Sequence, residues 1–192
     1  MAPGDCVVED LAGAQAQVGY RVRLWPRQPF AVRGYTLVVP PGRASELIPR
    51  FWEDAASDGR LAELVSCSAE RPWLLGLGSW DPACQKGGQR YTICIEETAR
   101  TDFSALAARH SLVRKEIGAS HWLCFELTQR LLLGRFWEDN PYQMMKRLGY
   151  RFHMGAPGDY SVGLHFDAYP PEFDEASHDR MEFWITVQPA RE

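Results

Sequence analysis

A pentapeptide that occurs twice limits the folds open to this chain of 192 residues. Arg50–Asp54 and Arg135–Asp139 both read Arg-Phe-Trp-Glu-Asp, and the second copy begins 85 residues after the first. Aliphatic pairs, Leu47-Ile48 and Leu132-Leu133, precede the two copies at the same helical spacing. Five identical residues that include a tryptophan rarely recur by chance in so short a chain. We therefore predict an internal duplication.

The two copies also match downstream of the pentapeptide. Leu77–Asp81 corresponds to Gly163–Asp167, and Arg90–Ile95 corresponds to Arg180–Ile185. Each copy therefore has the order strand, helix, strand, hairpin, strand, with a longer hairpin loop in the second copy. The pattern predicts an α+β fold in which two pseudo-symmetric βαββ repeats form one antiparallel sheet platform with its helices on one face.

The same pattern predicts the organisation of the chain. We expect residues 1–18 to be an N-terminal tail and residues 19–189 to be a single domain, with half-repeats at about 19–98 and 109–189. Within the second half, Ser111–Ile117 and His121–Leu127 are predicted to pair as a hairpin through Gly118-Ala119.

Composition excludes several classes of protein. A hydrophobic content of 45% with 24% charged residues is ordinary for a globular domain. A net charge of −4 gives no overall basic surface, so we expect no direct nucleic-acid partner. No apolar run approaches the roughly 18 residues of a membrane span, and Met1–Asp5 does not resemble a signal peptide, so we expect no membrane contact and a cytoplasmic location.

Motifs for metals and common cofactors are absent from the sequence. The five cysteines form no Cys-x-x-Cys pair and the five histidines have no metalloprotease spacing, so we predict no metal site and no cofactor. Gly76-x-Gly78 lacks the third glycine of a dinucleotide site. The acidic run Glu172–Asp179 lacks the spacing of a calcium loop and is predicted to be a solvated hairpin loop.

The last strand pattern carries the candidate site, because its two faces differ in chemistry. One face has the apolar set Met181, Phe183, Ile185 and Val187, and the other has Glu182, Trp184 and Thr186. The apolar face is expected to meet the Phe-Trp helices, which turns Glu182 and Trp184 away from them. A tryptophan beside a carboxylate suits a flat, apolar, cationic ligand. By periodicity alone, a solvated Glu182 and a Trp184 that only packs against the sheet are the commoner outcome.

The duplicated plan and the closing strand Glu182–Val187 resemble the GyrI-like small-molecule-binding family. This is the effector-binding domain of AraC-type and MerR-type drug-responsive regulators, and it also occurs as stand-alone proteins. The family's last strand typically reads Glu, an aliphatic or aromatic residue, Trp or Tyr, an aliphatic residue, Pro and Val. Here Thr186 replaces the proline, and Asp167-Ala168-Tyr169 replaces the family's Glu-x-Tyr element. The similarity covers about residues 19–189.

The resemblance implies a cleft on the sheet face away from the helices, which senses or sequesters lipophilic, often cationic, polyaromatic molecules. Glu182 matches the glutamate at the floor of that cleft, and Trp184 and Tyr169 match aromatic positions. The strand pattern adds three weaker candidates, Trp80, Trp122 and Phe125. Tyr35 is a further candidate for contact with the ligand. A protein partner or a homodimer stays open.

The resemblance also implies an alternative function, because some stand-alone members are thought to hydrolyse strained electrophilic rings in genotoxic natural products. In that case Glu182 would be the catalytic general base, and Tyr169 or Tyr35 would donate a proton to the leaving oxygen. The same residues serve both functions, so the sequence does not separate a binding protein from a cofactor-independent hydrolase.

Overall fold

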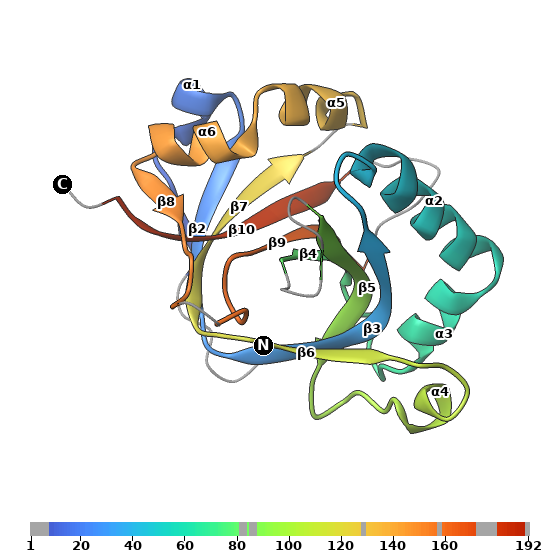
Figure 1. Ribbon diagram of the computed structural model, residues 1–192. Coiled ribbons are helices and arrows are strands. Elements are labelled where there is room, and N and C mark those ends of the chain that lie inside the picture. The colour runs from blue at the N-terminus through green and yellow to red at the C-terminus, as the bar shows by residue number, and fades with distance from the viewer. Residues whose placement is uncertain are drawn as a thin grey trace.

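The computed structural model describes residues 8–80, 84, 88–127, 130–156, 159–171 and 180–190, with the side chains of 130–133 excepted. In this part of the chain, ten strands form one antiparallel sheet accompanied by six helices. Figure 1 shows that the sheet is strongly curved and that the helices lie along its outer side. The predicted α+β architecture, with helices on one face of a single antiparallel sheet, is confirmed.

The strands and helices have the following bounds, in chain order. The strands are β1 (Glu9–Asp10), β2 (Arg21–Arg27), β3 (Phe30–Val39), β4 (Leu74–Ser79), β5 (Gln89–Glu97), β6 (Val113–Ile117), β7 (Ser120–Leu127), β8 (Tyr150–Phe152), β9 (Leu164–Tyr169) and β10 (Met181–Pro189). The helices are α1 (Ala14–Val18), α2 (Ala44–Ser57), α3 (Arg60–Ser66), α4 (Ser104–Ala107), α5 (Arg130–Glu138) and α6 (Pro141–Arg147).

The strand order relates the two halves of the sheet. It runs β1-β2-β7-β10-β9-β4-β5-β3-β6, and β8 pairs with β10. Corresponding strands of the two predicted repeats occupy equivalent places on either side of the β9–β4 pair. A duplicated chain would have this arrangement, although the duplication itself stays a prediction.

One pairing differs from the prediction. Residues 111–117 and 121–127 do not form a hairpin, because β6 pairs with β3 and β7 pairs with β2 and β10. Each half thus gives its first strand to the other half of the sheet. In this exchange β2 covers the edge of β7, and β6 covers the edge of β3. In local hairpins, β2 would have paired with β3 and β6 with β7. Sequence proximity favoured the hairpin, and long-range pairing overrode it.

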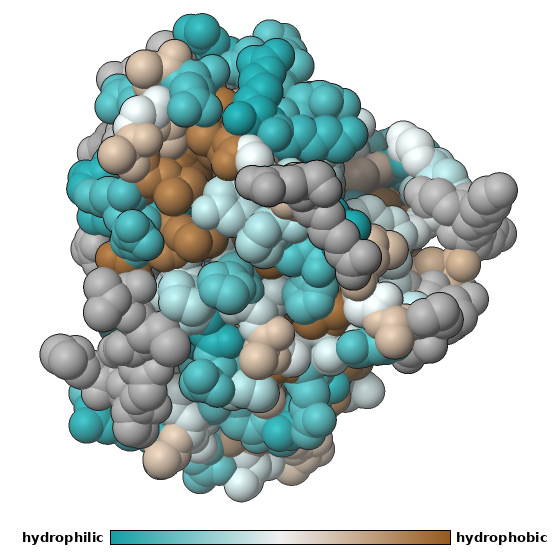
Figure 2. Space-filling view, turned by 90° about the vertical axis from the view of Figure 1, so that its left-hand side faces the viewer, coloured by the Kyte–Doolittle hydropathy of each residue, from teal (hydrophilic) through white to brown (hydrophobic). Residues whose placement is uncertain are grey.

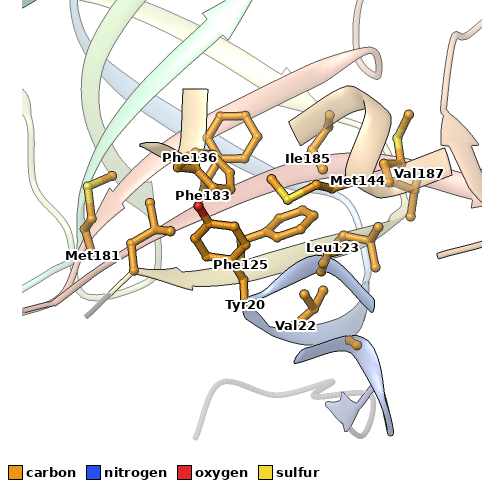
Figure 3. Close-up of a cluster of buried hydrophobic side chains, with 14 residues drawn as sticks. Tyr20, Val22, Leu123, Phe125, Phe136, Met144, Met181, Phe183, Ile185 and Val187 are labelled. Atoms are coloured by element: carbon orange, nitrogen blue, oxygen red, sulfur yellow. The ribbon is translucent and has the colours of Figure 1, made fainter. Parts of the chain in front are cut away.

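Two cores lie between the helices and the outer face of the sheet. In the first, Figure 3 shows Phe136 and Met144 from the helices meeting Phe125 and Phe183 from β7 and β10. The ring centroids of Phe136 and Phe183 are 5.2 Å apart. In the second core, Phe51 of α2 packs with residues of β3 and β5. The two phenylalanines of the repeated pentapeptide therefore have equivalent places in the two cores.

The two tryptophans of the pentapeptide differ from each other. Trp52 is half-buried, and its Nε1 donates a hydrogen bond to the Tyr91 hydroxyl at 3.0 Å. Trp137 packs against Phe136 and Phe183 but remains 47% exposed. The phenylalanines of the two Phe-Trp pairs are therefore core residues, whereas the two tryptophans are buried only in part.

A third cluster lies on the inner face of the sheet, where no described helix covers it. Its buried members are Val32, Leu75, Leu77, Cys94, Ile117, Trp122, Cys124, Leu164, Phe166, Ala168 and Trp184. The alternation predicted for β10 is confirmed, since Trp184 belongs to this cluster whereas Phe183 belongs to the helix-side core. The inner face is the one that positions the candidate site.

Part of the segment predicted as a tail is structured. β1 pairs with β2, and α1 buries Ala14 and Val18 in the first helix-side core. The acidic run Glu172–Asp179, predicted as a loop, lies outside the described residues, as do residues 1–7.

The surface combines polar and apolar regions. Hydrophilic side chains cover most of the face in Figure 2, and apolar ones gather in its upper part. Among the described residues, the large apolar side chains that are exposed include Trp80, Trp137, Met154 and Tyr160. Within the same residues, no helix combines the length and the apolar character needed to cross a membrane.

Candidate ligand-binding cleft

A cavity of about 360 Å³ opens on the inner face of the sheet. Strands β2, β7, β10, β4 and β5 supply its floor and walls, and the loops before β4 and after β5 supply its rim. Its lining residues are Val8, Arg23, Trp25, Arg27, Ser68, Glu70, Arg71, Pro72, Trp73, Leu75, Glu96, Thr98, Arg100, Thr101, Cys124, Glu182 and Trp184.

The strand register brings distant residues of the lining side by side. Arg23 of β2 and Trp184 of β10 both pair with Cys124 of β7, so the three form one row across neighbouring strands. Glu182 lies two residues from Trp184 on the same face and therefore diagonally from Arg23. Alternation along β2 and β10 therefore places the Trp184 indole, the Glu182 carboxylate and the Arg23 guanidinium together on the cavity floor.

Three tryptophans surround the cavity. The ring centroid of Trp184 is 5.3 Å from that of Trp25 at an interplanar angle of 89°, and 5.4 Å from that of Trp73 at 48°. Both separations lie in the range of favourable aromatic pairs. Trp25 and Trp73 are only partly buried, so they keep apolar ring surface at the cleft. The three rings form a wall suited to a flat or globular aromatic molecule.

Glu182 is the most deeply placed charge of the cleft, with a side chain only 2% exposed. Its Oε2 accepts a hydrogen bond from Trp184 Nε1 at 2.7 Å, and its Oε1 accepts one from Arg23 Nη2. Arg180 Nη2 lies 3.6 Å from the same Oε1. A buried carboxylate needs such partners to remain ionised at moderate cost. Glu182 is therefore already paired before any ligand enters.

A second ion pair joins Arg27 of β2 to Glu96 of β5. Arg27 Nη2 donates to both carboxylate oxygens of Glu96, at 2.9 and 2.8 Å. The Arg27 guanidinium also stacks on aromatic rings, with its Cζ 4.3 Å from the Trp25 centroid and 3.8 Å from that of Phe30. Such stacking is attractive for a guanidinium. Arg27 is thereby held against the aromatic wall.

The rim carries the remaining charges of the lining. Arg100 forms an ion pair with Glu70. Arg71 is exposed and has no ion-pair partner within the described part of the chain. The charged groups around the cavity are thus mostly paired with each other.

Of the residues predicted from the sequence, Glu182 and Trp184 line the cavity. Trp122 lies on the same face, but it is fully buried with its ring 5.3 Å from Phe166 and is not part of the lining. Trp80 is 40% exposed and packs near Phe152, away from the cavity.

The other predicted residues project toward the helices. Phe125 belongs to the first helix-side core. The Tyr169 ring lies 5.0 Å from Trp52 of α2, and the Tyr35 ring lies 5.6 Å from His110. Neither tyrosine lines the cavity, because odd-numbered residues of β9 and β3 face the outer side of the sheet.

Sequence reasoning missed Arg23, Trp25, Arg27 and Trp73. The first three had a signal, since Arg-Trp alternation in β2 lies opposite its apolar face of Val22 and Leu24. An arginine face opposite an apolar face is ordinarily the solvated side of an antiparallel strand, and only the tryptophan among these arginines indicated otherwise. Trp73 had no periodic signal because it lies in the loop before β4.

A separate polar network lies on the outer side of β9. The Tyr91 hydroxyl donates to Asp167 Oδ2 at 2.7 Å while accepting from Trp52. Burial raises the pKa of Asp167 to about 6, against the opposing effect of the Tyr91 hydrogen bond. Burial also raises the pKa of the neighbouring Tyr169. The network faces α2, so it is not part of the cleft.

No group of three or more His, Cys, Asp and Glu side chains is arranged for a metal ion in the part of the chain that the structure describes.

Fold and cleft together define an α+β domain with an aromatic cavity on the open face of a curved sheet. No protein-family model and no curated protein sequence matches the chain. Solved structures do. SAV2435 bound to tetraphenylphosphonium aligns with a TM-score of 0.66 at 19% identity, covering 87% of this chain and 93% of that one.

Two further structures share the architecture. A putative bacterial transcription regulation protein from Staphylococcus aureus MU50 aligns with a TM-score of 0.63 at 18% identity, over 88% of this chain and 99% of that one. An integron cassette protein from the mobile metagenome of Vibrio cholerae aligns with a TM-score of 0.54 at 13% identity, over 87% and 95%. The chain thus has the fold of the GyrI-like small-molecule-binding domains, as its sequence predicted.

Proposed function

We propose that this protein binds lipophilic polyaromatic small molecules, cationic ones among them, in the cleft of Trp25, Trp73 and Trp184, as a sensor or a sequestering protein. The observation that carries the proposal is the wall of three indole rings around a cavity whose floor holds the buried Glu182. The volume of about 360 Å³ suits a small organic ligand.

The energetics favour an aromatic ligand. Each aromatic contact contributes about 0.5–1.5 kcal/mol beyond the burial of its area. Apolar burial adds about 25 cal/mol per Å². Because Trp25 and Trp73 are only partly buried, a ligand that covers their faces gains both contributions without displacing core side chains. The shared fold with a protein solved with tetraphenylphosphonium supports the same class of ligand.

A titration with tetraphenylphosphonium and with a polyaromatic dye, followed by quenching of tryptophan fluorescence and by calorimetry, tests the proposal. Trp73→Leu should weaken binding by roughly fivefold to tenfold, the equivalent of one lost aromatic contact. Trp80→Leu is the matched control, since Trp80 was also a sequence candidate but lies outside the lining. Absence of binding to the wild-type protein, or equal losses in both variants, would refute the proposal.

The structure gives the hydrolase alternative no support. Glu182 and the two candidate proton donors, Tyr169 and Tyr35, project from opposite faces of the sheet. No tyrosine lines the cavity among the described residues. A general acid must come within hydrogen-bond distance of the leaving oxygen, and neither tyrosine is placed to do so. We therefore propose binding rather than hydrolysis.

A further inference from the structure

We infer that Arg23 is an internal counter-ion that makes the cleft indifferent to the charge of its ligand, and that this one side chain determines the charge selectivity of the site. The inference rests on the proposed function, because it concerns how the same cleft chooses among aromatic molecules. Glu182 was expected to attract cations, and the structure shows that its counter-charge is already built in.

The contacts of Glu182 leave little for a cation to gain. Arg23 Nη2 donates to Oε1, Trp184 Nε1 donates to Oε2, and Arg180 lies close by. A quaternary cation has no N–H group, so it cannot replace the hydrogen bonds that it would have to break. Displacing Arg23 would cost the Glu182 carboxylate both a hydrogen bond and the attraction of a positive charge. A quaternary cation would return only the attraction of its charge. The cation has no net advantage over a neutral molecule of the same shape.

The charges of the whole lining lead to the same conclusion. Its cations are Arg23, Arg27, Arg71 and Arg100, and its anions are Glu70, Glu96 and Glu182. Three ion pairs join six of these seven groups. The remaining Arg71 is exposed at the rim, where water and salt screen it. A ligand in the cavity consequently meets walls that are close to neutral.

Because Glu182 is buried, the Arg23–Glu182 ion pair has a larger effect on the charge of the cleft than the Arg27–Glu96 pair. The Glu182 side chain is 2% exposed, whereas that of Glu96 is 33% exposed. Without Arg23, Glu182 would keep Arg180, whose Nη2 lies 3.6 Å away on a side chain that is 46% exposed, so the buried carboxylate would be only weakly compensated. Glu96 without Arg27 would be screened by water and salt. Arg23 itself lies on β2, next to the edge of the sheet, with a side chain that is 27% exposed. It can be replaced without removing a core side chain.

Two probe ions of the same shape and opposite charge test the inference. Tetraphenylphosphonium and tetraphenylborate would be titrated at pH 8 into wild-type protein, Arg23→Gln and Arg27→Gln, with dissociation constants from calorimetry. We expect the two constants to differ by less than about threefold in the wild type. In Arg23→Gln, tetraphenylphosphonium should bind at least about tenfold better relative to tetraphenylborate. Arg27→Gln removes the same charge from the same strand and should change the ratio by less than about threefold.

A double variant, Arg23→Gln with Glu182→Gln, should return the ratio to that of the wild type, because the floor is neutral again. A tenfold preference of the wild-type protein for the phosphonium would overturn the inference even if Arg23→Gln failed to fold. An unchanged ratio in Arg23→Gln, or an equal change in Arg27→Gln, would overturn it too. In those cases binding itself would persist, and the proposed function would stand. If no protein bound either ion, both would fall.

Discussion

Two neighbouring side chains of β9 should give this protein stability contributions that change with pH in opposite directions. Burial raises the pKa of Asp167 to about 6. Burial lowers the pKa of His165 to about 4. Both side chains project to the helix side of the sheet, where Asp167 contacts Tyr91 and the His165 ring stacks on Phe183.

The signs follow from proton binding. Because the pKa of Asp167 is higher in the folded state than the ordinary 3.8, its contribution to stability is largest below pH 4 and declines as the pH rises through 6. Because the pKa of His165 is lower than the ordinary 6.5, its contribution is present above pH 6.5 and is lost as the pH falls toward 4. Each of these two pKa changes corresponds to about 3 kcal/mol. The two contributions therefore nearly cancel between pH 4 and 6.5.

The substitution Asp167→Asn removes the pH-dependent contribution of Asp167. It keeps the shape of the side chain and the oxygen that accepts the hydrogen bond from Tyr91. Relative to the wild type, the free energy of unfolding of this variant should rise by about 3 kcal/mol between pH 4 and 6.5. Urea unfolding at four pH values, followed by tryptophan fluorescence, measures the difference. His165→Phe keeps a ring against Phe183 and should give the opposite slope. If the Asp167→Asn and wild-type profiles were parallel over this range, the assignment of the pKa of Asp167 would be refuted.

Three further substitutions test the local structure. Gly34→Ala should prevent stable folding, measured by circular dichroism and solubility, because its Cβ would lie 1.9 Å from the Ile93 carbonyl oxygen on the paired strand. Gly134→Ala, in open space on α5, should instead raise the free energy of unfolding by about 0.5–1 kcal/mol in urea titrations. Asn140→Ala should lower the free energy of unfolding by about 1–2 kcal/mol, since the Asn140 side chain accepts a hydrogen bond from the amide of Tyr142 at the start of α6 and the residue has a φ of 58°. An unchanged free energy of unfolding in this variant would contradict the capping role.

The candidate site could be predicted from the sequence only where its residues obey local alternation. Glu182 and Trp184 share a face because successive residues of any strand point to opposite sides, and Phe183 packs on the helices for the same reason. The resemblance of the closing strand indicated the same two residues. Tyr169 shows the limit of that resemblance, because its position in β9 turns it toward α2.

The sequence by itself determined most of the strands and helices, the two faces of β10 and the α+β class, since these follow from helical and strand periodicity within short segments. Only the tertiary structure decided that β6 joins β3 and that β2 joins β7, because strand partners are chosen by contacts between distant segments. That exchange places Arg23 beside Glu182, 159 residues further along the chain. The charge of the cleft therefore depends on a pairing that no local pattern encodes.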